Sequence, residues 1–323
     1  MRVLLLDYKQ YSKENILRLE SNFIEVYKKN FSSIVGLKKF LRDKKESKKP
    51  IGIIFTSFGF FFDKSLIKYM DNKKRILASP TTSLTHIDYN NLNKKCKILS
   101  LKDRNTKVAL KKITSTAELT IGLILSLYRK INEATKSVNQ KRWDRNSFIG
   151  NQVYEKKIGI IGFGRIGRMV ATTLKSMGAK IYLYDKKKIR IPKGYTKKNI
   201  FYIFKNCDII SLHISSEKEN YKFIGRKYLK LMKKNSIIIN TARGEIIDEN
   251  YLYQILKKKK ISGAGLDVLI GDSNWKKVGN NKLINFSKAN KNLIITPHIG
   301  GCTFEASKLT KTKLIDSVIN ISQ

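Results

Sequence analysis

The chain has 323 residues, of which 41% are apolar, and its 66 basic and 25 acidic residues give a formal net charge of +41. No apolar run approaches the roughly 18 residues of a membrane span, which excludes a helical membrane protein. The charge would attract nucleic acid or an anionic membrane, but the basic residues are spread along the whole chain, so we expect neither specific nucleic-acid binding nor membrane attachment. The positive field should instead favour anionic substrates and cofactors.

The N-terminus and the cysteines point to a cytoplasmic protein. Residues Met1–Asp7 lack a long apolar region with a small-residue cleavage site, so they predict a buried first strand and not a signal peptide. The three cysteines, Cys96, Cys207 and Cys302, are far apart and lack the spacing of metal ligands. We therefore expect reduced thiols in a reducing compartment and no metal site.

In the first third of the chain, short apolar runs alternate with amphipathic stretches, which predicts an α/β protein with a parallel sheet. The predicted strands are Val3–Asp7, Phe23–Tyr27, Ile51–Thr56, Arg75–Ala78 and Lys97–Leu101, with helices at Ser33–Arg42 and Lys64–Met70. Ser115–Glu118 has the form of a capping box with Ser115 as N-cap. The apolar helix that it opens is predicted to run to about Ala134 and to link two domains.

A glycine-rich turn follows the next predicted strand, Lys157–Ile161. Gly162, Gly164 and Gly167 form a GxGxxG pattern that opens a helix, and the strand Ile181–Tyr184 then leads to Asp185. This order is typical of a dinucleotide site: the glycines permit a tight turn and close approach of a pyrophosphate, and the acid accepts hydrogen bonds from a ribose. The carboxylate would repel a 2′-phosphate, so NAD is favoured over NADP, although the basic residues that follow Asp185 weaken that preference.

Candidate catalytic side chains follow the later strands, Ile209–Leu212, Ser236–Asn240, Gly263–Asp267 and Leu293–Thr296. Ligands of open parallel sheets lie beyond the carboxyl ends of the strands, where Arg243, Asp267 and His298 fall. Histidine can take a proton from an alcohol near neutral pH, and a guanidinium can hold a carboxylate. The pattern therefore predicts oxidation or reduction of a hydroxy acid.

Four motifs together resemble the D-isomer-specific 2-hydroxyacid dehydrogenases: Gly162–Gly167 with Asp185, Ile239–Gly244, Gly265–Val268 and Pro297–Gly301. The resemblance implies a Rossmann-type doubly wound domain over residues 106–296 and a smaller flavodoxin-like α/β substrate domain built from residues 1–105 and 297–323. It also implies a homodimer and a small anionic 2-hydroxy or 2-keto acid as substrate.

The same resemblance implies roles for individual residues. His298 would be the acid/base, Arg243 would bind the substrate carboxylate, and Asp267 would contact the nicotinamide end of NAD. The expected cofactor-binding residues are Gly162, Gly164, Arg165, Ile166, Gly167, Asp185, His213, Thr241, Ala242 and Asp267.

Two positions depart from the family pattern. The family has a catalytic glutamate five residues after the aspartate that matches Asp267, and this chain has Asp272 there. The shorter aspartate can stabilise the imidazolium of His298 only if its loop lies further inward. The family's substrate loop is rich in glycine, whereas this chain has Thr82 and Ser83, whose backbone amides remain candidates for binding the substrate carboxylate.

The alternative hypothesis is a catalytically weak, NAD(H)-responsive regulator or nucleic-acid-associated protein, a role that a charge of +41 would suit. Arg243 and His298 argue against it, because a sensor needs neither. A single basic stripe on the surface would favour nucleic acid, and an even distribution would favour the enzyme.

Overall fold

The structure is a computed structural model that describes residues 1–43, 50–56, 59–71, 73–82, 84, 86–92, 94–215, 217–272 and 278–322. The chain divides into two compact units. Unit 1 comprises Met1–Ile113 and Cys302–Gln323, and unit 2 comprises Thr114–Gly301.

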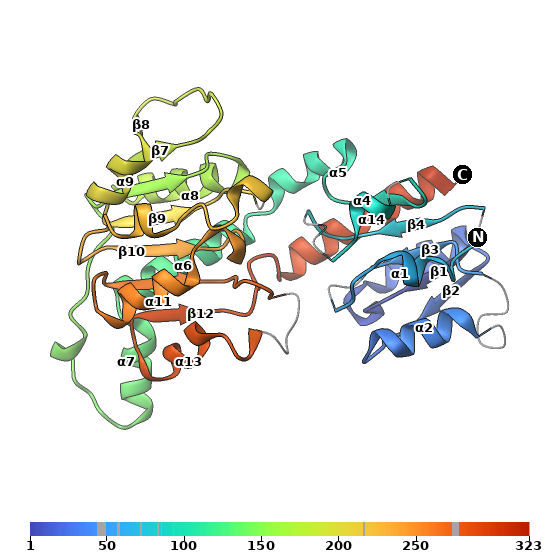
Figure 1. Ribbon diagram of the computed structural model, residues 1–323, viewed down its shortest axis with the longest axis horizontal. Helices are drawn as coiled ribbons and strands as arrows, with labels where there is room; N and C mark the ends of the chain where they lie inside the picture. The colour runs from blue at the N-terminus through green and yellow to red at the C-terminus, as the bar shows by residue number, and fades with distance from the viewer. Residues whose placement is uncertain are drawn as a thin grey trace. The chain divides into compact units, whose positions relative to one another are not determined.

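Unit 1 is a parallel sheet with helices on both faces (Figure 1). The sheet has the order β2-β1-β3-β4-β5 and consists of β1 (Arg2–Leu5), β2 (Glu25–Lys28), β3 (Ile53–Phe55), β4 (Ile76–Ala78) and β5 (Lys97–Leu99). The helices are α1 (Lys13–Asn22), α2 (Ile34–Arg42), α3 (Lys64–Ile67), α4 (Tyr89–Leu92), α5 (Arg104–Ala109) and α14 (Phe304–Ser322). This strand order is that of flavodoxin-like folds, as predicted.

The last helix of the chain, α14, completes one face of the unit 1 sheet. Its buried residues Leu314, Ile315 and Val318 pack with apolar residues of β1 and β3. Lys311 is buried beside the N-terminal segment, and its ammonium donates to the backbone carbonyl of Gln10 at 2.7 Å. These contacts explain why the two ends of the chain fold together.

Unit 2 is a larger parallel sheet with the order β12-β11-β10-β9-β6-β7-β8. Its strands are β6 (Lys157–Ile161), β7 (Lys180–Tyr184), β8 (Thr196–Lys197), β9 (Ile209–Leu212), β10 (Ile237–Asn240), β11 (Gly263–Leu266) and β12 (Leu293–Ile295). Its helices are α6 (Ser115–Tyr128), α7 (Ile131–Asn139), α8 (Arg165–Ser176), α9 (Ile200–Asn206), α10 (Arg226–Leu229), α11 (Glu249–Lys257) and α13 (Lys282–Ala289).

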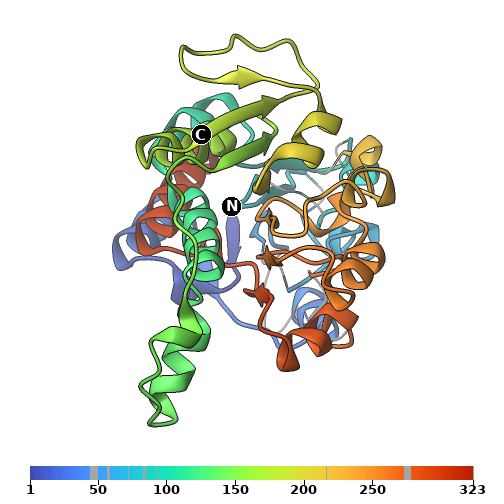
Figure 2. The same cartoon turned by 90° about the vertical axis from the view of Figure 1, so that its left-hand side faces the viewer.

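Two apolar layers cover the unit 2 sheet. Helices α6 and α8 pack on one face, and α9, α10, α11 and α13 pack on the other (Figures 1 and 2). Strands β9, β10 and β11 are buried along their whole length, as expected for a parallel sheet covered on both faces. The strand order reverses between β6 and β9, which is the switch point of a doubly wound Rossmann-type sheet. The predicted fold class is confirmed.

Every strand predicted from the sequence is present, with ends shifted by at most two residues. The capping-box prediction was wrong in detail. Ser115 is the first residue of α6 and is buried, while Thr114 is the N-cap residue. Glu118 still reaches back to a hydroxyl, but that hydroxyl is Oγ1 of Thr114, at 2.5 Å. Ser115 is already the first helical residue of α6, so the N-cap position falls one residue earlier, at Thr114.

The predicted helix to Ala134 was also wrong, because α6 ends at Tyr128 and α7 begins at Ile131. The returning chain stops α6: the amide of Asn151 donates to the carbonyl of Tyr128 at 2.8 Å. Lys130 then adopts a left-handed conformation with φ of 51°, which turns the chain into α7.

The division between the units lies at Ile113/Thr114 and Gly301/Cys302, later in the chain than the boundaries at 105/106 and 296/297 expected from the sequence. The first shift has a packing cause, since Leu110 and Ile113 form an apolar cluster with Ala306 of α14. Among the described residues, no helix combines the length and apolar character needed to cross a membrane.

Candidate active site

The turn after β6 is shaped by its glycines. Gly162 has φ of +94°, and a Cβ there would lie 2.5 Å from the carbonyl oxygen of His213. A Cβ on Gly167 would lie 2.0 Å from the carbonyl oxygen of Gly162, so α8 packs directly on the turn. A side chain at either position would force the turn open.

Gly164 differs from the other two, because a Cβ there would meet no atom within 4 Å. The space beside it lies at the N-terminus of α8, which begins at Arg165 and continues through Ile166. The backbone amides of a helix N-terminus favour an anion, and burial lowers the pKa of the Arg165 guanidinium. The turn therefore fits the pyrophosphate of a dinucleotide.

Asp185, at the end of β7, holds this turn in place. Its Oδ2 accepts a hydrogen bond from the amide of Phe163 at 2.8 Å, and its Oδ1 accepts one from the amide of Lys187 at 2.8 Å. Lys186 does not pair with Asp185, because its ammonium lies 2.5 Å from Oε2 of Glu219. Each carboxylate oxygen retains a lone pair that a ribose hydroxyl could use.

His213 lies on the other side of the switch point, directly after β9. Its Nε2 lies 2.8 Å from Oγ of Ser211, and burial lowers the pKa of the imidazole to about 3. The ring is therefore neutral at physiological pH, so His213 adds no positive charge next to the Gly162 turn.

The segment after β10 presents Arg243. The Asn240 side chain, which is buried, donates to the carbonyl of Arg243 at 2.8 Å and accepts from the amide of Ala242 at 3.1 Å. Oγ1 of Thr241 lies 2.8 Å from Oγ1 of Thr120 on α6. These bonds fix the backbone of the segment, and burial lowers the pKa of the Arg243 guanidinium, a shift that the charge of Asp272 opposes.

Asp267, at the end of β11, is 1% exposed and organises the segment that carries His298. Its Oδ1 accepts from the amide of Ile299 at 2.8 Å and from Oγ1 of Thr296 at 2.6 Å, and its Oδ2 accepts from the amide of Gly300 at 2.8 Å. Burial raises the pKa of this carboxyl, while the hydrogen bonds act in the opposite direction. A scaffolding role for Asp267 was not predicted from the sequence.

His298 pairs with Asp272, the residue that departs from the family pattern. Nδ1 of His298 lies 2.7 Å from Oδ2 of Asp272, and the two side chains are 38% and 23% exposed. The loop turns inward at Gly271, which has φ of +76°, and the amide of Asp272 donates to the carbonyl of Leu269 at 3.1 Å. With this turn, Asp272 contacts His298 although its side chain is one methylene shorter than the glutamate of the family pattern.

Glu249, at the start of α11, anchors the same loop and was missed by the sequence analysis. Its Oε1 accepts from the amide of Ile270 at 2.6 Å, and its Oε2 accepts from the side chain of Asn281 at 2.7 Å. Burial raises the pKa of this carboxyl. The sequence shows only an acidic residue in the first turn of a helix, a position where a carboxylate usually stabilises the helix dipole.

Unit 2 thus brings together Arg243, Asp272 and His298 at the carboxyl ends of its strands, the edge of the sheet where the Gly162 turn also lies. An arginine, a carboxylate and an imidazole in this arrangement can bind an acid and move a proton. The predicted substrate-binding residue Thr82 belongs to unit 1 and has an exposed side chain. Ser83 lies outside the described residues.

Comparison with known proteins identifies the family. The sequence profile of the D-isomer specific 2-hydroxyacid dehydrogenase NAD-binding domain matches residues 121–300, more than half of the chain. The chain belongs to this family. In the D-2-hydroxyacid dehydrogenases this domain binds NAD, so the Gly162 turn and Asp185 lie in the NAD-binding domain of the present member.

Individual relatives agree with this assignment. D-3-phosphoglycerate dehydrogenase of Methanocaldococcus jannaschii is 39% identical over 211 residues, which cover 63% of this chain but only 38% of that protein. Glyoxylate reductase of Thermococcus litoralis is 35% identical over 256 residues, which cover 76% of this chain and 72% of that protein. An acyclic imino acid reductase solved with NADPH and D-Arg has a TM-score of 0.79 at 26% identity, and the match covers 100% of this chain and 97% of that one.

Proposed function

We propose that this dehydrogenase interconverts a small D-2-hydroxy acid and its 2-keto acid with NAD(H). The observation that carries the proposal is the 2.7 Å contact between Asp272 and His298 at the strand edge that also presents Arg243. When bound, the nicotinamide supplies or accepts the hydride at C2. The chain itself must bind the carboxylate, polarise the C2 oxygen and move one proton.

Each of these tasks has a suitable side chain. His298 would donate a proton to the C2 oxygen during reduction and accept it during oxidation. Asp272 would stabilise the imidazolium through a charge-assisted hydrogen bond. Arg243 would bind the substrate carboxylate with its planar fork and polarise the C2 oxygen.

NAD is the cofactor that the Asp185 carboxylate favours, since it would repel a 2′-phosphate. The residues proposed to bind it are Gly162, Gly164, Arg165, Ile166, Gly167, Asp185, His213, Thr241, Ala242 and Asp267. The solved relative bound to NADPH and the lysines after Asp185 support NADP(H) as a weaker alternative.

Unit 1 is proposed to be the substrate domain and unit 2 the dinucleotide-binding domain. In unit 1, the backbone amide of Thr82 is proposed to bind the substrate carboxylate; Ser83, which lies outside the described residues, stays a prediction for the same role. The glyoxylate reductase relative supports a small 2-keto acid as substrate.

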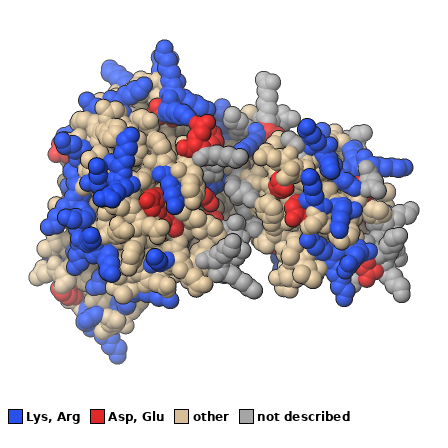
Figure 3. Space-filling view, viewed as in Figure 1, with Lys and Arg blue, Asp and Glu red and all other residues tan. Residues whose placement is uncertain are grey.

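The distribution of charge favours an enzyme over the nucleic-acid-associated alternative. On the face shown in Figure 3, Lys and Arg side chains are scattered over both units and are not gathered in one stripe. Scattered basic residues attract small anions, but they do not form the continuous basic surface that binds nucleic acid. Cys96 and Cys207 are buried free thiols, which supports a reducing compartment such as the cytoplasm.

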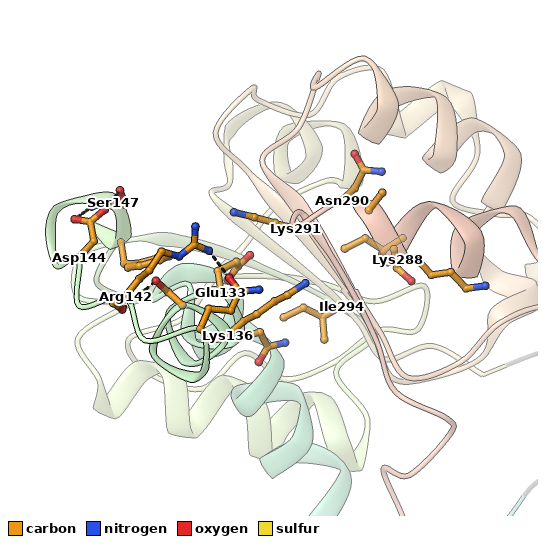
Figure 4. Close-up of a pocket in the computed structure, with 16 residues that line it drawn as sticks. Glu133, Lys136, Arg142, Asp144, Ser147, Lys288, Asn290, Lys291 and Ile294 are labelled. Carbon is orange, nitrogen blue, oxygen red and sulfur yellow. Dashed lines mark hydrogen bonds between the residues drawn. The ribbon is translucent and has the colours of Figure 1, made fainter.

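A homodimer is proposed through the arm formed by α7 and residues 140–154. Trp143 is 89% exposed, and Ile149 and Tyr154 are also exposed. A cavity of about 600 Å³ lies between this arm and α13 with β12, lined by Lys136 and Ile294 among others (Figure 4). Exposed apolar residues grouped on one element mark an interaction surface, and a second copy of the arm is the proposed occupant.

The dimer proposal predicts that Trp143→Glu shifts the protein toward monomer in sedimentation equilibrium. A charge in a desolvated interface is costly. Val35→Glu is the matched control, because Val35 is also an exposed apolar residue, 71% exposed, but lies on α2 outside the arm, and its replacement should leave the association constant unchanged. A wild-type monomer at micromolar concentration would contradict the proposal.

The proposed activity predicts NADH-dependent reduction of at least one acid in a panel that varies the C3 substituent: glyoxylate, pyruvate, hydroxypyruvate and a C3-phosphorylated 2-keto acid. The positive net charge should give a kcat/KM that falls as salt is added, because the substrates are anions. Steady-state rates with NADH and NADPH measure both properties. Absence of turnover with every acid, or a clear preference for NADPH, would contradict the proposal or its cofactor assignment, respectively.

A further inference from the structure

A buried polar cluster lies in unit 1, formed by Thr56, Ser79, Thr81 and His86. Thr56 and Ser79 directly follow β3 and β4, so the cluster lies at the carboxyl ends of neighbouring strands. Nε2 of His86 lies 3.2 Å from Oγ1 of Thr56 and 3.3 Å from Oγ of Ser79. Oγ of Ser79 in turn lies 2.8 Å from Oγ1 of Thr81.

His86 joins the two ends of one loop. At the first end, the amide of Ser79 donates to the carbonyl of Leu99, and the carbonyl of Thr81 accepts from Leu101 at 3.1 Å. At the second end, the carbonyl of His86 accepts from the amide of Phe62 at 2.9 Å. The hydrogen bond between Ser79 and the imidazole of His86 links residues seven positions apart in the sequence and joins the two ends of the loop.

The imidazole that closes the loop is uncharged. His86 is 2% exposed, and burial lowers its pKa to about 4. A neutral ring has one donor and one acceptor nitrogen, so Nε2 either accepts from the hydroxyls or donates to one of them, depending on the tautomer. Above pH 5 the loop is therefore held by neutral hydrogen bonds that do not change with pH.

We propose that His86 is a positioning residue that sets the Thr81–Thr82 backbone in the geometry needed to bind the substrate carboxylate. The inference rests on the proposed function of this loop. Within the described part of the chain, the amide of Thr82 has no hydrogen-bond acceptor, so it is available to an anion. Loss of the imidazole frees the loop to sample other conformations, and the amide then leaves its binding geometry.

The test compares His86→Ala with His86→Gln and His86→Asn. His86→Ala should raise KM for the 2-keto acid about tenfold, the effect of roughly one lost hydrogen bond, with kcat within about threefold of wild type and unchanged NADH affinity. Glutamine places an amide near the position of Nε2 and should restore KM, whereas the shorter asparagine should not. Ser79→Ala should raise KM similarly, and the double variant should show no further increase.

Two results would overturn the proposal: an unchanged KM in His86→Ala, or rescue by asparagine as complete as by glutamine. Amide hydrogen exchange separates this outcome from failure of the proposed function. If the wild type reduces no 2-keto acid, the proposed function fails, but faster exchange in residues 79–86 of His86→Ala that is reversed in His86→Gln retains the positioning role. Equal exchange in all three proteins would refute it.

Discussion

Replacing His298 with alanine is expected to lower kcat for 2-keto acid reduction by about 10²–10⁴-fold, the usual contribution of a positioned general acid. NADH affinity should change little, because the glycine turn and Asp185 that are proposed to bind the dinucleotide keep their contacts. Steady-state kinetics and a fluorescence titration with NADH measure the two effects separately. A variant that retained most of the wild-type rate would remove His298 from the mechanism.

The backbone of His298 calls for a second variant. His298 has φ of 55°, a left-handed conformation that alanine adopts less readily than asparagine. His298→Asn keeps the tolerance for this conformation and removes the acid. If loss of proton transfer is the cause, both variants should lose activity to a similar extent. A nearly active asparagine variant would instead assign the alanine effect to backbone strain.

Burial excludes the other two histidines as the general acid. The chain has three histidines, and burial lowers the pKa of His213 to about 3 and that of His86 to about 4. These two rings are neutral throughout the range above pH 5, since burial disfavours the charged form. Neither ring can therefore donate the proton for reduction above pH 5, so activity that remains in His298→Asn cannot be assigned to another histidine of the chain.

Replacing Asp272 with asparagine is expected to lower kcat for reduction by about 10- to 100-fold. The change keeps the shape of the side chain but removes the charge that pairs with Nδ1 of His298 at 2.7 Å, and a hydrogen bond between charged groups is worth about 1.5–3 kcal/mol. Reduction requires the imidazolium, which the carboxylate stabilises. Activity should therefore decline at lower pH in the variant than in the wild type, as a pH–rate profile would show.

Asp272→Glu is the matched control for this experiment. It restores the residue of the family pattern and keeps the charge, so activity should stay near the wild-type value or rise. NADH affinity should be unaffected in both variants. If Asp272→Asn changes neither the rate nor the pH profile, the contact seen between Asp272 and His298 has no role in proton transfer.

The sequence by itself determined the elements whose signals are local. Apolar runs predicted the strands of both sheets except β8, because a strand buried on both faces must be apolar along its length, whereas both residues of β8 are exposed. The glycine turn after β6 was predictable for a similar reason, since only glycine can occupy positions where a Cβ would lie 2.5 Å or less from a backbone oxygen. Arg243 and His298 could be placed at one edge because parallel strands all end on the same side of the sheet.

Only the tertiary structure decided where α6 begins and ends. Two adjacent hydroxyl residues, Thr114 and Ser115, could each serve as N-cap; in the folded chain the N-cap is Thr114, and Ser115 is buried as the first residue of α6. No glycine or proline marks the end of α6 at Tyr128, because the stop comes from Asn151. A distant backbone amide leaves no local pattern.

The pairing of Asp272 with His298 was open in the sequence for the same physical reason. Whether an aspartate reaches an imidazole depends on the path of the loop, which Gly271 and the half-buried carboxylate of Glu249 on α11 determine. His86 gave even less indication, as a lone histidine in a predicted loop. Its burial against Thr56 and Ser79 arises only when β3 and β4 align side by side, because hydrogen bonds between segments far apart in sequence form only in the packed fold.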